Sequence, residues 1–126
     1  MKSVISALVI FILIVTMIVI TCVYTNNVTE EMLQYLYKNE NHVSKNNWRT
    51  AQNEVENMEN IWYSNRNIMV ILFNHAVIEK VDLSIAKIKK TIQMQKKEDF
   101  IYESKNLGLL MESLVEQQEI SIGNVF

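Results

Sequence analysis

The chain has 126 residues, with 12 Lys and Arg against 14 Asp and Glu, and its formal net charge of -2 makes nucleic acid an improbable partner. A chain of this length has room for one domain with a single core. It contains no proline and only two glycines, Gly108 and Gly123, so helix is the default conformation. The single cysteine, Cys22, excludes an intrachain disulfide.

An uncharged apolar segment runs from Val4 to Tyr24. As a helix rising ~1.5 Å per residue it is about 31 Å long, which matches the hydrocarbon core of a bilayer. We therefore predict an N-terminal transmembrane anchor at residues 1–25. A cleaved signal peptide is an alternative, but its apolar region is typically about 7–15 residues long. Lipidation at Cys22 is another, because Val19–Cys22 loosely matches a lipobox.

The charges around this segment predict its orientation. Lys2 precedes the segment, and the next basic residue, Lys38, follows only after Glu30 and Glu31. Because basic residues favour the cytoplasmic side, we expect a cytoplasmic N-terminus and an extracytoplasmic domain at residues 26–126. The predicted location is the cell membrane, crossed once, and the lipid bilayer is the first expected partner.

The extracytoplasmic part is predicted to be a small antiparallel bundle of three to four helices, which makes the fold class all-α. Its first helix is expected at Val28–Val43, after Asn27 and Glu30, whose spacing fits a capping pair. Steps of four and seven residues place one apolar stripe on this helix. The stripe consists of Val28, Met32, Leu36 and Val43.

The second helix carries the strongest periodic pattern in the chain. Asn46 or Asn47 is expected to cap it, and it is predicted to run through the polar cluster Ser64–Asn67 to about Phe73. Spacings of three and four place one apolar stripe on its face. The stripe consists of Trp48, Ala51, Val55, Met58 and Trp62.

A run of six apolar residues, Ile68–Phe73, ends this helix. The run is too short to cross a bilayer, so we expect it to be the innermost part of the bundle. A buried strand is the alternative interpretation of the same run.

Two further helices complete the predicted bundle. The third is expected from His75 or Ala76, with Val81, Ile85, Ile88 and Ile92 inward, and with a solvated face that includes Lys87, Lys89, Lys90, Lys96 and Lys97. The fourth is expected to end before Ser121–Asn124, where Gly123 permits a turn. Its predicted inward residues are Phe100, Leu107, Leu110 or Met111, and Leu114.

Four side chains are candidates for a partner or ligand surface, namely Trp48, Trp62, His75 and Glu79. His75 and Glu79 are four residues apart, which suits an ion pair or part of a metal site. The two tryptophans are expected in the core, and a groove for a ligand or partner helix is the alternative. We find no catalytic pattern, metal cluster or cofactor motif, so we expect no enzyme activity and no cofactor.

Two classes of function remain. The first is an interaction or scaffold subunit of a membrane-associated complex, and the second is an extracytoplasmic ligand-binding or sensing module. A sensor needs an output, and only about three residues precede the predicted span. We therefore favour the interaction or scaffold subunit, with another integral membrane protein as its partner.

Several short segments carry a likeness to known sequences: Asn47-Trp48 followed by Ala51, then Trp62, Phe73-Asn74-His75, Ser84–Ile88 and Gly123–Phe126. Together with the N-terminal anchor, they make most of the chain resemble domain of unknown function 4363, a family of small bacterial membrane-anchored proteins found largely in clostridia. Where the family pattern has an aspartate before the histidine and acids after it, this chain has Asn74, Ala76 and Val77.

The resemblance implies an architecture and a topology. The family has no assigned activity, so the resemblance implies no mechanism and no catalytic residue. Its members are often encoded beside a second membrane family, domain of unknown function 421. This association implies an integral membrane protein as partner, in line with the function favoured above.

Overall fold

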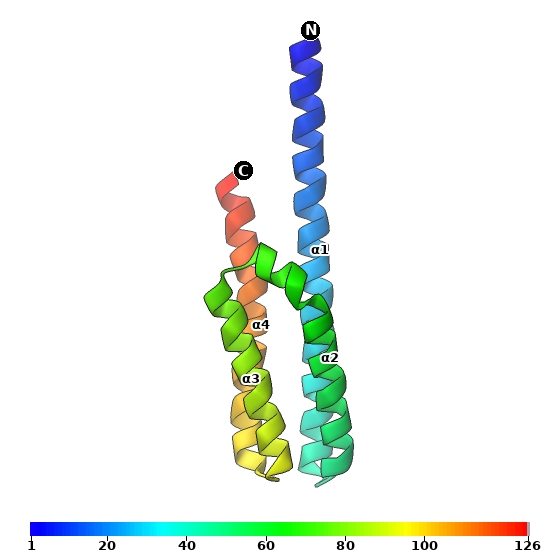
Figure 1. Ribbon diagram of the computed structural model, residues 1–126, viewed down its shortest axis with the longest axis vertical. Helices are drawn as coiled ribbons and strands as arrows, with labels where there is room; N and C mark the ends of the chain where they lie inside the picture. Colours follow the sequence, from blue (N-terminus) through cyan, green and yellow to red (C-terminus); the bar gives the residue numbers. More distant parts are fainter. Residues whose placement is uncertain (126) are drawn as a thin grey trace.

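The protein is built from four long helices. The computed structural model describes the backbone of residues 1–125 and the side chains of residues 1–118. In chain order the helices are α1 (Lys2–Ser44), α2 (Trp48–Leu72), α3 (His75–Gln93) and α4 (Lys97–Val125) (Figure 1). The described residues contain no strand, so the predicted all-α class is confirmed and the alternative of a strand at residues 68–73 is wrong.

The helices form an antiparallel bundle in which each packs against two neighbours. α1 contacts α2 and α4, and α3 contacts the same two helices. Successive helices run in opposite directions, and α1 extends far beyond the other three at its N-terminal end (Figure 1). The molecule is therefore a four-helix bundle from which α1 protrudes furthest (Figure 1).

The two turns at the far end of the bundle, opposite this protrusion, have the same backbone design. Asn46 and Gln95 each adopt a positive φ, of 59° and 54° respectively. The following amide donates to a carbonyl five residues back, from Asn47 to His42 and from Lys96 to Thr91, at 2.8 and 2.9 Å. This is the Schellman arrangement, which satisfies carbonyls that a helix end would otherwise leave unpaired.

The predicted anchor and the predicted first helix are one continuous helix. α1 has no interruption at Asn27, so the predicted cap there is wrong. Without proline or glycine between residues 25 and 44, the helix satisfies its own backbone groups and needs no new start. Its N-terminal half is long and apolar enough to cross a membrane, and burial in the bundle begins at Thr25.

The predicted apolar stripes form the core. Every stripe residue listed above on the four helices is buried except Trp48, which is half-buried against the core, and Leu110. Between Leu110 and Met111, the inward residue is Met111, which is fully buried. α2 also runs without interruption through Ser64–Asn67, as predicted. Asn47 occupies its N-cap position, but its side chain makes no capping hydrogen bond in the described structure, so the predicted cap is only partly confirmed.

The apolar run Ile68–Phe73 is not the innermost part of the bundle, which corrects the prediction. Met69 and Phe73 are buried, whereas Ile68 is 48% and Ile71 81% exposed. Successive residues of a helix point about 100° apart, so six in a row cover all sides, and only one side of α2 meets the core. The run therefore contributes to the core and also leaves an apolar surface outside it.

The fourth helix is longer than expected. α4 continues to Val125 and does not end before Ser121–Asn124. Gly123 has no positive φ, so it is accommodated within the helix and does not form the predicted turn. A glycine lowers helix stability by about 1 kcal/mol but does not by itself end a helix. Phe126 lies outside the described residues.

Candidate functional site

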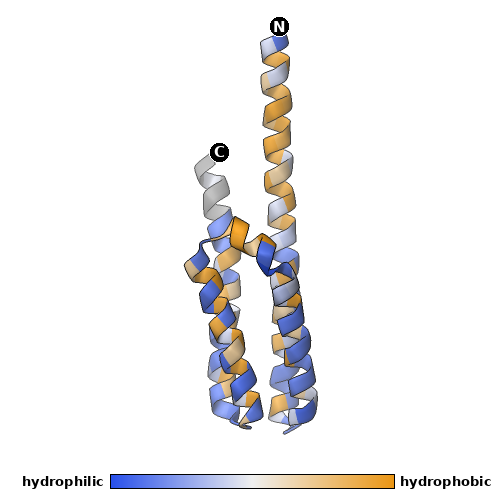
Figure 2. Cartoon of the chain, viewed as in Figure 1, coloured by the Kyte–Doolittle hydropathy of each residue, from blue (hydrophilic) through white to orange (hydrophobic). Residues whose placement is uncertain are grey.

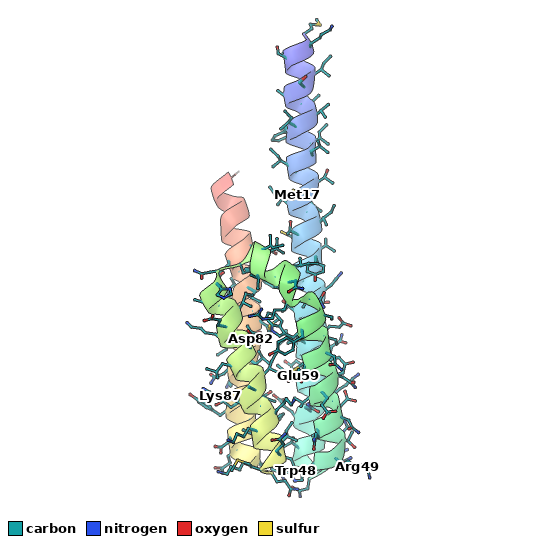
Figure 3. The ribbon with its side chains drawn as sticks, viewed as in Figure 1. Met17, Trp48, Arg49, Glu59, Asp82 and Lys87 are labelled. Carbon is teal, nitrogen blue, oxygen red and sulfur yellow. The ribbon has the colours of Figure 1, made fainter. Side chains whose placement is uncertain are left out.

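The four candidate side chains lie at different places on the bundle. Trp48 begins α2 and His75 begins α3, so the 25 residues of α2 separate them. Figure 3 shows Trp48 at the end opposite the protruding half of α1. Trp62 is fully buried between these two levels. The four residues therefore do not share one surface.

His75 and Glu79 contact each other on the exposed first turns of α3. His75 Nε2 lies 3.3 Å from Glu79 Oε1, and both side chains are about two-thirds exposed. Asn74 caps the same helix, because its Oδ1 accepts a hydrogen bond from the Ala76 amide. Within the part of the chain that the structure describes, no group of three potential metal ligands gathers here or elsewhere. The pair is a surface contact within one helix.

Trp62 belongs to a polar network that joins α2 to α3. Its Nε1 donates to Asp82 Oδ1 at 2.7 Å. Arg66, one turn further along α2, binds the same carboxylate through Nε and Nη2, with a shortest distance of 2.7 Å. A two-pronged guanidinium contact fixes both the distance and the direction of the partner. The network therefore sets how α2 and α3 align at this level.

The environment of Asp82 shifts its pKa. Burial raises the pKa, but the hydrogen bonds from Arg66 and Trp62 lower it by more, so the net pKa lies below the ordinary value of 3.8. Hydrogen bonds and positive charge favour the ionised form of a carboxyl group. Asp82 is therefore an anion in the folded protein at neutral pH.

Acidification is expected to weaken the bundle through Asp82. Because its pKa is lower in the folded than in the unfolded state, ionised Asp82 stabilises the fold above the unfolded-state pKa of about 3.9. This stabilisation disappears as pH falls through the folded-state pKa. The thermal midpoint can be followed by circular dichroism over about three pH units, from pH 5 to pH 2. It should fall more steeply for the native protein than for Asp82→Asn. The control variant Glu56→Gln, at an exposed site, should show the same dependence of the thermal midpoint on pH as the native protein. If Asp82→Asn also shows the native dependence, the stabilising role of Asp82 is contradicted.

A second contact between α2 and α3 corrects one prediction about the lysines. Lys89 was expected on a solvated face, yet its Nζ lies 3.1 Å from Glu59 Oε1 and the side chain is only 31% exposed. Lys87, Lys90 and Lys96 are exposed as predicted, whereas Lys97 is half-buried because it begins α4. The α2–α3 interface thus holds two ion pairs about two helical turns apart. Both pairs join helices of this chain.

The described residues form a groove between α1 and α4. Its volume is about 540 Å³. Leu109 and Ile101 stand exposed along it, at 59% and 53%, and Gly108 leaves space between them and α1. The groove is lined by Leu33, Leu36, Tyr37 and Glu40 of α1 and by Ile101, Ser104, Lys105, Gly108, Leu109 and Glu112 of α4.

The floor of the groove depends on a glycine. A Cβ atom built at Gly108 would meet only Leu33 Cδ2, at 3.7 Å, which is an ordinary contact. The position therefore tolerates a side chain, but that side chain would occupy the groove. At one end, Ser104 Oγ lies 3.5 Å from Glu40 Oε1, so the two walls approach each other there.

Sequence reasoning missed both the network and the groove. Trp62 and Arg66 are four residues apart on one helix face, which signals a possible shared partner but does not identify Asp82. Ile101 and Leu109, together with Lys105, form a second stripe at steps of four on α4, separate from its core stripe. That second apolar stripe was the available signal for an exposed contact surface.

Comparison with known proteins gives one family. The family model described as domain of unknown function (DUF4363) matches residues 19–125. No curated protein matches the chain, and no solved structure does so either. The matched region includes the end of the apolar segment and the whole bundle, so the groove and the polar network both lie within it.

Proposed function

This chain belongs to the family described as domain of unknown function (DUF4363), and from that premise we propose that it is a membrane-anchored interaction subunit. In this proposal α1 crosses the cell membrane once with its N-terminus in the cytoplasm. The bundle lies on the extracytoplasmic side and binds another integral membrane protein. The groove between α1 and α4 is the docking surface.

The anchor is supported by the N-terminal half of α1. None of its most apolar stretch is buried in the bundle. Figure 2 shows this half mostly in the hydrophobic colour, while hydrophilic and hydrophobic residues alternate along the helices of the bundle. Exposing some twenty apolar residues to water is costly, whereas a bilayer covers them at no such cost. Lys2 before the segment, with no further basic residue until Lys38, supports the orientation.

The groove carries the proposal of a docked helix. Two packed helices leave a furrow between them that accepts the side-chain ridge of a third helix, with axes about 8–10 Å apart. Ile101 and Leu109 are eight residues apart and face the same way, so they match a ridge about two turns long. Glu40, Lys105 and Glu112 place charges at its edges, where a partner's polar side chains meet them.

The continuity of α1 favours a partner in the same membrane. The groove runs along α1, and α1 is also the proposed span. A helix that leaves the membrane beside α1 approaches the groove already aligned with it. Leu33 is nine residues beyond Tyr24, so the partner's helix must extend at least about 14 Å from the membrane surface. The expected occupant is an amphipathic helix that continues a transmembrane segment.

A small ligand fits this surface less well than a helix does. Ligand sites typically bury about 70–90% of the bound molecule, which requires an enclosed pocket. Here Tyr37 is 72% exposed, and Leu109 and Ile101 are more than half exposed. The groove would leave one side of a small molecule in water, whereas a helix spans the groove and covers these side chains together.

Photo-crosslinking in native membranes tests the proposal. A photoreactive amino acid placed at Leu109 of the full-length protein is expected to capture one integral membrane protein on irradiation. The same amino acid at Gln52, exposed on α2 outside the groove, is expected to capture none. Equal capture from both positions, capture of a second copy of this chain alone, or no capture at Leu109 would overturn the proposal.

A further inference from the structure

The connection between α2 and α3 presents an apolar surface that no other part of the described chain covers. Ile71 is 81% and Ile68 48% exposed, although Met69 and Phe73 of the same run are buried in the core. Figure 2 shows this connection in the hydrophobic colour between hydrophilic stretches of α2 and α3. Two exposed isoleucines three residues apart on one helix face form a small apolar patch.

This patch lies at the end of the bundle from which the proposed span emerges (Figure 1). The Tyr24 hydroxyl donates a hydrogen bond to Asn65 Oδ1, which fixes the level of Asn65 on α2 at the end of the uncharged segment. α2 runs antiparallel to α1, so Ile68 and Ile71 lie beyond Asn65 on the membrane side. The last turns of α2 lean from α1 toward α3, across this end of the bundle.

The charges around the patch do not oppose contact with lipid. Residues 67–74 contain no Asp, Glu, Lys or Arg. On either side, Arg66 is bound to Asp82 and Glu79 is paired with His75. An apolar patch flanked by polar side chains suits the boundary between the lipid headgroups and the acyl chains.

We propose that the α2–α3 connection is a second membrane contact, in which Ile68 and Ile71 insert into the interface of the leaflet nearest the bundle. The proposal rests on the single-pass anchor proposed above. It gives the bundle two points of attachment, the span and this connection, which together fix its tilt and rotation. The groove between α1 and α4 then faces neighbouring proteins in a constant orientation. Because the patch carries no net charge, insertion requires no anionic lipid.

Fluorescence quenching in vesicles tests this contact. The full-length protein, with Cys22→Ser to remove the native thiol, receives a single cysteine by Ile71→Cys and carries a polarity-sensitive dye there. In phosphatidylcholine vesicles, iodide in the water is expected to quench this dye several-fold less than a dye at Tyr102→Cys. Tyr102 is 66% exposed near the far end of α4. Lipids brominated on the acyl chain are expected to quench the Ile71 dye and to leave the Tyr102 dye unchanged.

A dye at Phe11→Cys, inside the proposed span, distinguishes failure of the second membrane contact from failure of the anchor. If iodide quenches Ile71 as strongly as Tyr102 while Phe11 stays protected, the second contact is overturned and the anchor stands. If Phe11 is also quenched, the anchor itself is overturned, and the second contact with it. Ile71 is outside the core, so circular dichroism should show an unchanged helix content for the labelled protein.

Discussion

Trp62→Ala is expected to be the most destabilising single substitution in the bundle. The indole is fully buried and its Nε1 holds Asp82 at 2.7 Å, so the change removes core volume and one hydrogen bond together. Truncating a buried tryptophan typically costs about 3–5 kcal/mol. Thermal unfolding of the full-length protein in detergent, followed by circular dichroism, should show a midpoint lower by many degrees.

Two comparison variants separate the contributions to this loss. Trp62→Phe keeps most of the ring but removes the donor, and the loss of a hydrogen bond to a charged group costs about 1.5–3 kcal/mol. Trp48→Ala removes an indole that is only half-buried, so its effect should be smaller than that of Trp62→Ala. If the two alanine variants unfold at the same temperature, the central position of Trp62 in the core is refuted.

Gly108→Leu is expected to abolish partner capture while the fold is preserved. A Cβ at Gly108 meets only Leu33 Cδ2, at 3.7 Å, so the backbone accepts a side chain there. A leucine in a helix interior is also more favourable than glycine by about 0.8 kcal/mol. Its isobutyl group fills the groove and prevents a partner helix from packing on Leu109. Crosslinking from Leu109 in native membranes should therefore be lost, with an unchanged or higher thermal midpoint.

The second glycine of α4 supplies the matched control. Gly123 has nothing within 4 Å of a Cβ built on it. Gly123→Leu thus makes the same substitution in the same helix, away from the groove. It should keep the crosslink at the native yield. Loss of the crosslink in both variants would point to an effect on α4 as a whole and would contradict a specific role for the groove.

Most of the core was predictable because helical periodicity is a strong local signal. Val81, Ile85 and Ile88 recur on one face of α3, and such a pattern has no stable arrangement except burial. The same reasoning failed for Ile68–Phe73, where a continuous apolar run has no period. Periodicity therefore places a side chain on a face, but it does not tell whether that face ends inside or outside the bundle.

The groove and the polar network depend on distances between helices, which a single sequence does not contain. Asp82 is 16 residues from Arg66 and belongs to another helix. Its role appears only when the α2–α3 pairing is known. Leu109 and Ile101 are ordinary exposed hydrophobic residues by themselves, and such residues are common on protein surfaces. They become a candidate site when α1 supplies the second wall.

Mapping two crosslinks on the partner tests the docked helix most directly. Photoreactive residues placed one at a time at Ile101 and Leu109 are eight positions apart, about 12 Å along α4. A partner helix that lies along the groove has the same rise, so the two captured residues should lie about 7–8 positions apart in one extracytoplasmic helix. Crosslinks to two different proteins, or to sites far apart in one protein, would contradict a single helix bound between α1 and α4.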